Sequence, residues 1–277
     1  MKQRIIADSS CDIFEMEGID FISVPLTIST DERSFVDDKA LDVDGMLTYL
    51  AGYEGRSYTA CPNMEAWLQA YRGADEIFVV TLSSNVSGTY AAAVSAAALY
   101  TEENPNAKIH VFDTLSAGPE VQMLAQKLRQ YVLQEKSFEE ICQLAEAYMK
   151  KTAIYFCLQS FHNFAENGRV NKAVAKIGGM LGIRIMATAS DGGTIEITDK
   201  CRGDKGTLKL FLEKLKKAGY RGGEIYLAHC HNESFAQLIS DAVRKLYENA
   251  KVKIYETRGL CSFYAEKGGI LLGFERA

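Results

Sequence analysis

The chain has 277 residues, a formal net charge of −5 and 47% hydrophobic residues. This length favours two domains over one, and the hydrophobic content is sufficient for a sizeable core. The negative net charge, with no long run of Lys or Arg, argues against a nucleic-acid-binding protein.

The cysteines and the apolar runs indicate the cellular compartment. The seven cysteines are scattered, odd in number and without a CxxC pair, which favours reduced thiols over a disulfide framework or a zinc site. The N-terminus turns polar too early for a signal peptide, and no apolar run approaches the length of a membrane span. We therefore expect a soluble, cytoplasmic protein without a metal or cofactor.

The first predicted strand, Arg4 to Ala7, leads into the polar segment DSSCD at 8–12. Ligands bind beside the carboxyl ends of strands in parallel α/β sheets. The candidate ligand-binding residues here are therefore Asp8, Ser9 and Ser10. A capped turn is the simpler explanation of the same residues.

A second apolar strand is predicted over Phe21 to Ile28, where Pro25 indicates an edge strand or a bulge. The acidic segment 31–44 follows and predicts a loop and then a helix. Its Asp37 and Asp38 could take part in a metal site, but no His or third carboxylate is suitably spaced. We interpret them as solvated loop charges.

The segment YTACPN at 58–63 precedes a predicted helix with an apolar face. Asn63 is a plausible N-cap of that helix. The hydroxyl of Thr59 could donate a hydrogen bond to a ligand, or Thr59 could be an ordinary turn residue.

A hydroxyl-rich loop joins an apolar strand ending near residue 82 to an alanine-rich helix predicted over 87–100. The loop would hold its hydroxyls beside the unpaired N–H groups and the positive dipole end of the helix, which favour an anion. Its candidate ligand-binding residues are Ser84, Ser87, Gly88 and Thr89.

The anion is expected to be singly charged. No Lys or Arg lies between Glu76 and Glu102, whereas a triphosphate loop uses a Lys. A carboxylate therefore suits this loop better than a nucleotide. The alternative is a serine that only caps a structural helix.

Strands and helices alternate through the first half of the chain, with a strand at 108–112 and helices at 116–135 and 138–150. This pattern predicts an α/β fold with a mainly parallel sheet flanked by helices. We place the end of this N-terminal domain, residues 1–151, at the Lys150-Lys151 pair.

Residues 152–277 are predicted to form an α+β domain with a mixed or antiparallel sheet, because a hairpin is predicted at its centre. The hairpin joins strands 183–189 and 194–198 through the turn Asp191-Gly192-Gly193. The other predicted elements are a strand at 154–158, helices at 171–181, 204–218 and 233–249, and strands at 224–230 and 252–255.

His229 and His231 end one of these strands, where they would share a face. A metal site is conceivable, but no third ligand is identifiable nearby. His229 is also the candidate to test as a catalytic base, and Asn232 is a candidate N-cap of the next helix.

Five short motifs occur in the order found in the DegV family of bacterial fatty-acid-binding proteins, which the sequence resembles over nearly its whole length. They are DSSCD at 8–12, TACPN at 59–63, SSNVSGTY at 83–90, NGR at 167–169 and KCRG at 200–203.

The resemblance implies that one long-chain fatty acid is held between two α/β-type domains. Its carboxylate would lie at Thr59 and the Ser87-Gly88 helix start, and its acyl chain in an apolar tunnel. Family members present the acid to a separate fatty-acid kinase, which implies no catalysis by this chain itself and leaves room for transient membrane contact. Arg169 and Arg202 fall on family positions implicated in kinase docking or in the network at the carboxyl end, although each could be an ordinary surface Arg.

The C-terminal segment departs from the family pattern. Many members have an HTGPG-like segment whose His is thought to serve ligand binding or phosphoryl transfer, and that position falls near Ala265. Tyr264 beside it offers a hydroxyl donor but a weaker proton acceptor than His. Two alternatives to the kinase-coupled carrier therefore stay open. One is a binder of lipids or small carboxylates without kinase coupling, and the other is a hydrolase or phosphotransferase that uses Ser84 or Ser87.

Overall fold

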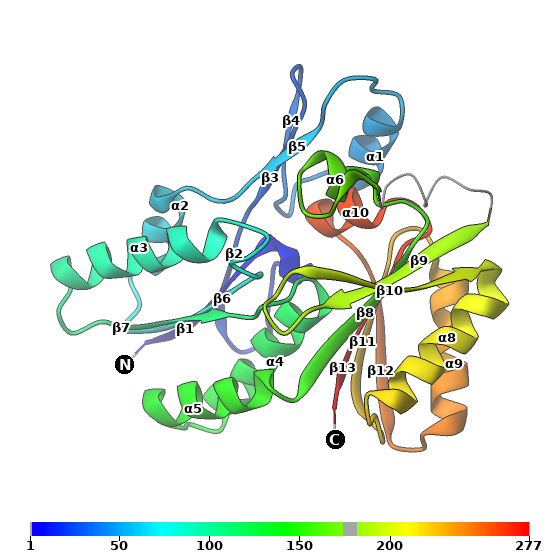
Figure 1. Ribbon diagram of the computed structural model, residues 1–277. Coiled ribbons are helices and arrows are strands. Elements are labelled where there is room, and N and C mark those ends of the chain that lie inside the picture. Colours follow the sequence, from blue (N-terminus) through cyan, green and yellow to red (C-terminus); the bar gives the residue numbers. More distant parts are fainter. Residues whose placement is uncertain (1, 174–181, 277) are drawn as a thin grey trace.

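The computed structural model describes residues 2–173 and 182–276, and the strands within them form three sheets (Figure 1). The four-stranded sheet has the order β2 (Asp20–Val24), β1 (Gln3–Asp8), β6 (Glu76–Thr81), β7 (Lys108–Asp113). The six-stranded sheet has the order β10 (Ile195–Arg202), β9 (Ile183–Ala189), β8 (Thr152–Leu158), β13 (Ile270–Glu275), β11 (Gly223–His229), β12 (Ala250–Glu256). The small sheet has the order β4 (Ser34–Val36), β3 (Thr27–Ser29), β5 (Tyr58–Ala60).

The four-stranded sheet is parallel throughout and is covered on both faces. One face packs against α2 (Met64–Tyr71) and α3 (Thr89–Glu103), and the other against α4 (Pro119–Leu133) and α5 (Phe138–Met149). The central strand β6 is buried at every residue, as expected for a parallel strand between two helical layers.

The strand order of this sheet creates a crevice for a ligand. The chain passes from β1 outward to β2 on one side, and from β6 outward to β7 on the other. The carboxyl ends of β1 and β6 therefore meet at a topological switch point, where ligands bind in open α/β sheets. The loops that leave this point carry Ser10 and Ser87.

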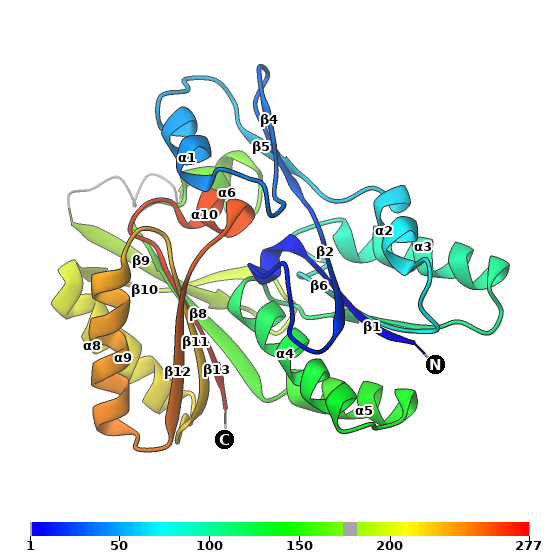
Figure 2. The ribbon, with the colours of Figure 1, turned by 180° about the vertical axis from the view of Figure 1, so that it is seen from behind.

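The six-stranded sheet is mixed, with β11 and β12 parallel and the other described pairs antiparallel. Its outer face packs against α8 (Gly203–Lys217) and α9 (Glu233–Leu246). Its inner face is turned toward the rest of the molecule, and α4 lies between it and the parallel sheet (Figure 2).

The small antiparallel sheet comes from the beginning of the chain but packs against its end. Together with α1 (Val43–Ala51), it forms a core with α10 (Gly259–Ala265). Ile28, Phe35, Met46 and Phe263 are the buried members of that core. The short helix α6 (His162–Glu166) lies next to α10.

The predicted fold class is confirmed: a parallel α/β sheet with flanking helices is joined to a C-terminal part with a mixed sheet. The strands of the parallel sheet all precede residue 151, and those of the six-stranded sheet all follow it. The division into domains at that residue stays a prediction.

Several predicted elements are corrected. The single strand over Phe21–Ile28 is wrong, because Pro25 and Leu26 separate β2 from β3, which belong to different sheets. The acidic segment 31–44 contains the strand β4. This strand has only three residues, too few to show a recognisable pattern in the sequence. Residues 174–181 of the predicted helix 171–181 lie outside the described residues.

Two predicted helix caps were tested as well. Asn63 caps α2 by accepting a hydrogen bond from the N–H group of Ala66. Asn232 stands at the N-cap position of α9 but does not cap it, since its side chain donates to the carbonyl of Gly268. Within the described residues, no helix is both long and apolar enough to cross a bilayer.

Candidate ligand-binding site

One pocket lies between the inner face of the six-stranded sheet and the switch point of the parallel sheet. It encloses about 850 Å³ of empty space including its open mouth. Its walls are largely apolar. The apolar lining residues are Leu26, Leu82, Val86, Ala117, Ile154, Phe156, Leu158, Phe164, Ala189, Ile195, Leu260, Ala265 and Leu271.

The polar lining is sparse and carries little charge. Among the described lining residues, Arg169 is the charged one, and the remaining polar groups are mostly hydroxyls. They are Ser10, Thr59, Ser83, Ser87, Ser116, Thr188, Thr194 and Tyr264. This composition suits an apolar molecule with one singly charged or uncharged polar group.

A pair of hydroxyls lies at one part of this lining. Oγ1 of Thr59, on β5, is 2.8 Å from the hydroxyl of Tyr264, on α10. The ring of Tyr264 stacks on Phe164 with ring centroids 4.5 Å apart. Burial raises the pKa of Tyr264, so this side chain keeps its proton and acts as a donor at neutral pH.

Arg169 is fixed by backbone carbonyls. Its Nε donates to the carbonyl of Val86 at 3.1 Å, and its Nη1 donates to the carbonyl of Asn167. The positive charge of Arg169 is close enough to Tyr264 to favour the ionised form of that phenol. The guanidinium therefore lies near both the β6–α3 loop and the hydroxyl pair.

The first turn of α3 has backbone N–H groups without a hydrogen-bond acceptor among the described residues, as the sequence suggests. Gly88 is the N-cap residue and supplies no side-chain hydrogen bond. Oγ of Ser87 accepts a hydrogen bond from the N–H group of Thr89 at 3.3 Å. Within the described part of the chain, the N–H groups of Gly88, Tyr90 and Ala91 have no acceptor, which leaves donors available at the positive end of the helix.

In the DSSCD segment, Asp8 and Ser9 stabilise the fold and Ser10 lines the pocket. Asp8 is fully buried and accepts hydrogen bonds from Ser10 and from the N–H group of Leu82, so it ties the ends of β1 and β6 together. Oγ of Ser9 accepts from the N–H group of Leu26. Ser10 lines the pocket.

The turn of the β9–β10 hairpin packs against the loop between β6 and α3. Oγ of Ser83 donates to the carbonyl of Gly193 at 2.7 Å, and Nδ2 of Asn85 donates to the carbonyl of Gly192 at 2.7 Å. Gly193 has φ +74°, and a Cβ there would collide with Oγ of Ser83. Glycine is therefore required for the hairpin turn to dock on the loop.

The interpretation of Asp37 as a solvated loop charge is wrong. Asp37 is fully buried, and its two carboxylate oxygens accept hydrogen bonds from the N–H groups of Gly259, at 2.8 Å, and Leu260, at 2.9 Å. These are the first residues of α10, so the carboxylate occupies the positive end of that helix. A Cβ on Gly259 would lie 2.6 Å from Oδ1 of Asp37, which excludes any larger residue there.

The small sheet therefore holds α10 at both ends. Asp37 follows β4 and binds the N-terminus of α10, while Thr59 on β5 meets Tyr264 near its C-terminus. Asp12 adds a third contact by accepting a hydrogen bond from the N–H group of Arg258 at 2.8 Å. No sequence pattern pointed to these contacts, since the partners are more than 200 residues apart.

The structure separates the predicted site residues into three groups. Five of them line the pocket, namely Ser10, Thr59, Ser87, Arg169 and Tyr264. Five others do not line it but lie within two residues of a lining residue along the chain, namely Asp8, Ser9, Ser84, Gly88 and Thr89. Two, Arg202 and His229, do not line it and belong to the six-stranded sheet.

The last two groups have other roles in the fold. Ser84 is exposed, and its N–H group donates to Asp113. Arg202 is exposed at the junction of β10 and α8. His229 is 6% exposed, and burial lowers its pKa.

His231 does not share a strand face with His229. It lies beyond the end of β11 with φ +48°, and its Nε2 is 3.0 Å from Oδ1 of Asp44. Among residues 2–173 and 182–276, no group of three or more His, Cys, Asp or Glu side chains is arranged to hold a metal ion.

The chain is similar to known proteins over its whole length. A family model described as an uncharacterised protein of the DegV family matches residues 2–275. A DegV domain-containing protein of Streptococcus pneumoniae is 42% identical, with 99% of each chain covered.

Two solved structures match the fold closely. A DegV family protein from Eubacterium eligens, loaded with heptadecanoic acid, has a TM-score of 0.97 and 47% identity over 99% of this chain and 100% of its own. The Fatty Acid Kinase B3 protein of Streptococcus pneumoniae, loaded with linoleic acid, has a TM-score of 0.98 and 41% identity over 100% of both chains. On the family match and these relatives, the chain belongs to the DegV family.

Proposed function

We propose that the protein binds one long-chain fatty acid in the pocket between its two large sheets. The main support for this proposal is an apolar pocket whose described lining contains a single charged side chain, Arg169. One carboxylate matches one cation and a few hydroxyls, and each buried methylene of the acyl chain adds roughly 0.8 kcal/mol to the affinity.

Relatives of the same fold support this ligand class. The structure from Eubacterium eligens contains heptadecanoic acid, and the kinase-related protein of Streptococcus pneumoniae contains linoleic acid. Both share more than 40% of their residues with this chain.

The carboxylate is assigned to Thr59, Tyr264, Arg169 and Ser87, with the free N–H groups of the α3 start behind them. The acyl chain would run along the inner faces of β8 and β13, where Ile154, Phe156 and Leu271 form the wall. The remaining predicted site residues, Asp8 and Ser9 above all, would support this arrangement from behind.

The chain is proposed to be a carrier that presents the acid to a separate fatty-acid kinase and has no catalytic step of its own. The relative from Streptococcus pneumoniae is named as a component of a fatty-acid kinase. His229 does not line the pocket, and the polar contact of Ser87 in the described residues is with a backbone N–H group. This arrangement offers no base to a serine nucleophile.

The carrier is proposed to act in the cytoplasm as two domains, 1–151 and 152–277, that close around the acid. The seven cysteines are free thiols, as expected in a reducing compartment. Residues 200–217, mostly α8, contain seven Lys or Arg and two Asp or Glu in a chain of net charge −5. This basic surface would favour transient contact with an anionic membrane.

Mass spectrometry of an organic extract of the purified, denatured protein tests the proposal. We expect one fatty acid per protein, with its chain length and saturation given directly by the mass. A clean extract, together with no uptake of added oleate or palmitate, would contradict fatty-acid binding.

Kinase coupling needs a separate test. The loaded protein is mixed with ATP and a fatty-acid kinase, and acyl phosphate is measured for the wild type and for Ala265→His. Turnover of the wild type would support the kinase-coupled carrier. If neither form is turned over by any cognate kinase, the protein binds its acid for another purpose.

A further inference from the structure

Two buried carboxyl groups meet at the start of α10, the helix that forms one wall of the proposed lipid pocket. Oδ1 of Asp12 accepts a hydrogen bond from the N–H group of Arg258 at 2.8 Å. Asp37 accepts hydrogen bonds from the next two N–H groups, those of Gly259 and Leu260. Because the three donors are consecutive in the chain, the two carboxyl groups lie close together. Both are buried, with Asp12 7% exposed and Asp37 fully enclosed.

Two negative charges at this place would repel each other unless a cation compensated them. Neighbouring buried carboxylates do not both ionise readily, because the protein interior screens their repulsion poorly. The guanidinium of Arg258 lies over the ring of Phe14 and donates to the carbonyl of Leu41. Within the described residues, this guanidinium forms no ion pair with either aspartate. Asp12 and Asp37 are therefore expected to share one proton near neutral pH.

The hydrogen bonds assign this proton to Asp12. Asp37 receives a backbone N–H group on each of its two oxygens, an arrangement that favours the ionised carboxylate. Asp12 receives one N–H group, and its Oδ2 is buried without a described hydrogen-bond partner. A buried oxygen without a donor is far more costly as part of a charged carboxylate than as part of a neutral acid. Asp12 is therefore the neutral member of the pair.

The pKa values of the two aspartates agree with this assignment. Burial raises the pKa of Asp12 to about 8, the N–H group of Arg258 lowers it, and the charge of Asp37 raises it further. Burial also raises the pKa of Asp37, but its two backbone donors and the hydroxyl of Ser9 lower it. Asp8 adds its charge to the surroundings of Asp37.

The other titratable groups that face Asp12 among the described residues are thiols and a phenol. They come from its own segment, from the end of β11, from β12 and from α10, and they are Cys11, Cys230, Tyr255 and Cys261. Burial raises the pKa of all four, so they stay uncharged near neutral pH. A change in charge around pH 8 at this place is therefore a change at Asp12.

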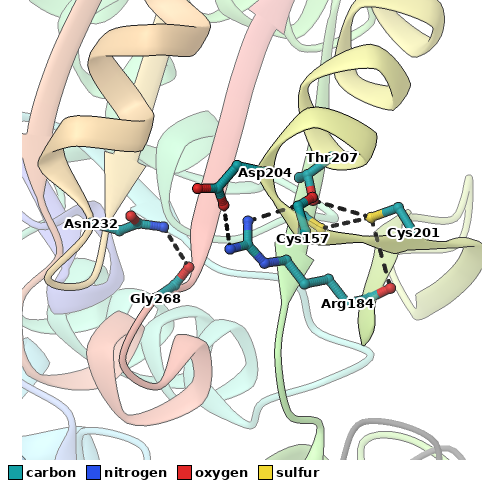
Figure 3. Close-up of polar contacts among 8 residues, drawn as sticks. Cys157, Arg184, Cys201, Asp204, Thr207, Asn232 and Gly268 are labelled. Carbon is teal, nitrogen blue, oxygen red and sulfur yellow. Dashed lines mark hydrogen bonds and ion pairs between the residues drawn. The ribbon is translucent and has the colours of Figure 1, made fainter. Parts of the chain in front are cut away.

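The far end of α10 is anchored without these carboxyl groups. Nδ2 of Asn232, at the start of α9, donates to the carbonyl of Gly268, three residues after the helix (Figure 3). The N–H group of Gly268 donates in turn to the carbonyl of Cys230 at 2.8 Å. Leu260 and Cys261, at the start of the helix, line the lipid pocket. Loss of the contacts at the start would therefore displace these two lining residues while the end stays attached.

We propose that Asp12 is a positioning residue, whose neutral acid form allows the start of α10 to sit beside ionised Asp37 and so keeps this helix in the wall of the lipid pocket. When Asp12 releases its proton, a second charge lies beside the first, and the start of α10 separates from the two carboxyl groups. The apparent affinity for the fatty acid then falls with the fraction of protein in which α10 is seated. This inference rests on the fatty-acid binding proposed above.

The dissociation constant for oleate, measured by calorimetry between about pH 6 and 9.5, tests the role of this proton. For the wild type it should rise above about pH 8, by up to about tenfold per pH unit. Asp12→Asn keeps an oxygen for the N–H group of Arg258 and cannot ionise, so the ratio of the wild-type constant to its own cancels any titration of oleate. Asp38→Asn, at an exposed loop acid, is the matched control and should follow the wild type.

Trypsin cleavage after Arg258 provides a second readout that needs no ligand. The bond between Arg258 and Gly259 is held against Asp12 and Asp37 when α10 is seated and becomes accessible when the start of the helix separates. Cleavage after Arg221, an exposed residue outside this contact, is the internal reference for the activity of the protease. The ratio of the two cleavage rates should rise above about pH 8 in the wild type and stay constant in Asp12→Asn.

Parallel pH profiles of the wild type and Asp12→Asn, in the dissociation constant or in the cleavage ratio, would overturn the proposal. A wild-type affinity that falls on acidification instead would also overturn it, because the sign would then be that of an ionised Asp12. No binding of oleate by the wild type at pH 6 would contradict the fatty-acid proposal itself. The cleavage ratio would still decide whether the proton on Asp12 holds α10.

Discussion

The two polar walls of the pocket are built in different ways. The loops after β1 and β6 leave the buried centre of a parallel sheet, and Asp8 ties them together within one body of structure. The opposite wall is α10, a helix of seven residues, which is too short to be stable by itself. It is held by Asp37 and Thr59 of the small sheet.

This difference separates a preformed wall from a docked one. The N–H groups at the start of α3 exist wherever the parallel sheet is folded. The hydroxyl of Tyr264 reaches the pocket only when α10 is seated on the small sheet. Substitutions on the preformed wall should therefore lower only the affinity for the fatty acid. Substitutions on the docked wall should lower both this affinity and the stability of the protein.

The largest effect is expected from Asp37→Ala. This change leaves the N–H groups of Gly259 and Leu260 buried without an acceptor, after the loss of two charge-assisted hydrogen bonds. The free energy of unfolding, measured in urea, should fall by about 3 kcal/mol. Asp38→Ala, at the exposed neighbouring residue, should change it by less than about 1 kcal/mol, and equal effects of the two variants would refute the anchoring role of Asp37.

Thr59→Val and Tyr264→Phe test the contact between the small sheet and the docked wall near the C-terminus of α10. Each removes one hydroxyl of the 2.8 Å pair and should weaken fatty-acid binding by about 2 kcal/mol. The dissociation constant for oleate, measured by calorimetry, provides the readout. The double variant should lose less than the sum of the two, because both hydroxyls act as a unit. Strict additivity would show that they bind the acid independently.

The pH dependence of stability tests the burial of the carboxyl groups of Asp12 and Asp8. Burial raises the pKa of Asp12 to about 8 and that of Asp8 to about 6, so between about pH 4 and 8 the native state binds protons that the unfolded chain has released. The free energy of unfolding should therefore be highest at the acid end of this window and fall as the pH rises, by up to about 1.4 kcal/mol per pH unit for each group.

Asp12→Asn isolates one of these groups. The amide keeps an oxygen for the N–H group of Arg258 and cannot ionise, so the slope above pH 6, where Asp8 has already titrated, should become shallower. Asp38→Asn serves as the matched control and should keep the wild-type slope. An unchanged slope in Asp12→Asn would place the titrating group elsewhere.

The smallest effect is expected on the preformed wall. Ser87→Ala removes a single hydroxyl while the free N–H groups behind it remain, so oleate affinity should fall by about 1 kcal/mol with stability nearly unchanged. Exposed Ser84, on the same loop, provides the control, and Ser84→Ala should leave affinity unaltered. Unchanged affinity in Ser87→Ala and Thr59→Val together would mean that the carboxylate lies elsewhere.

The preformed wall could be predicted from sequence because its signals are local. An apolar strand, a run of hydroxyls and an alanine-rich helix together predict where α3 starts. The structure was needed only to show that Ser84 is exposed and does not line the pocket. The docked wall could not be predicted in the same way. Asp37 has the surroundings of a loop acid, and its partners lie 222 and 223 residues away. The family resemblance supplied Thr59 and Tyr264 as separate candidates, but their contact appears only in three dimensions.

The docking of the small sheet on α10 also sets the order in which the protein is completed during synthesis. Residues 27–60 leave the ribosome about 200 residues before Gly259–Ala265. At typical translation rates of about 5–20 residues per second, the early sheet waits roughly 10–40 s for its partner helix. During that time Ile28 and Phe35 have no α10 to bury them. The nascent chain therefore carries an exposed apolar surface until α10 emerges, and it can acquire a lipid at the completed site only after that point.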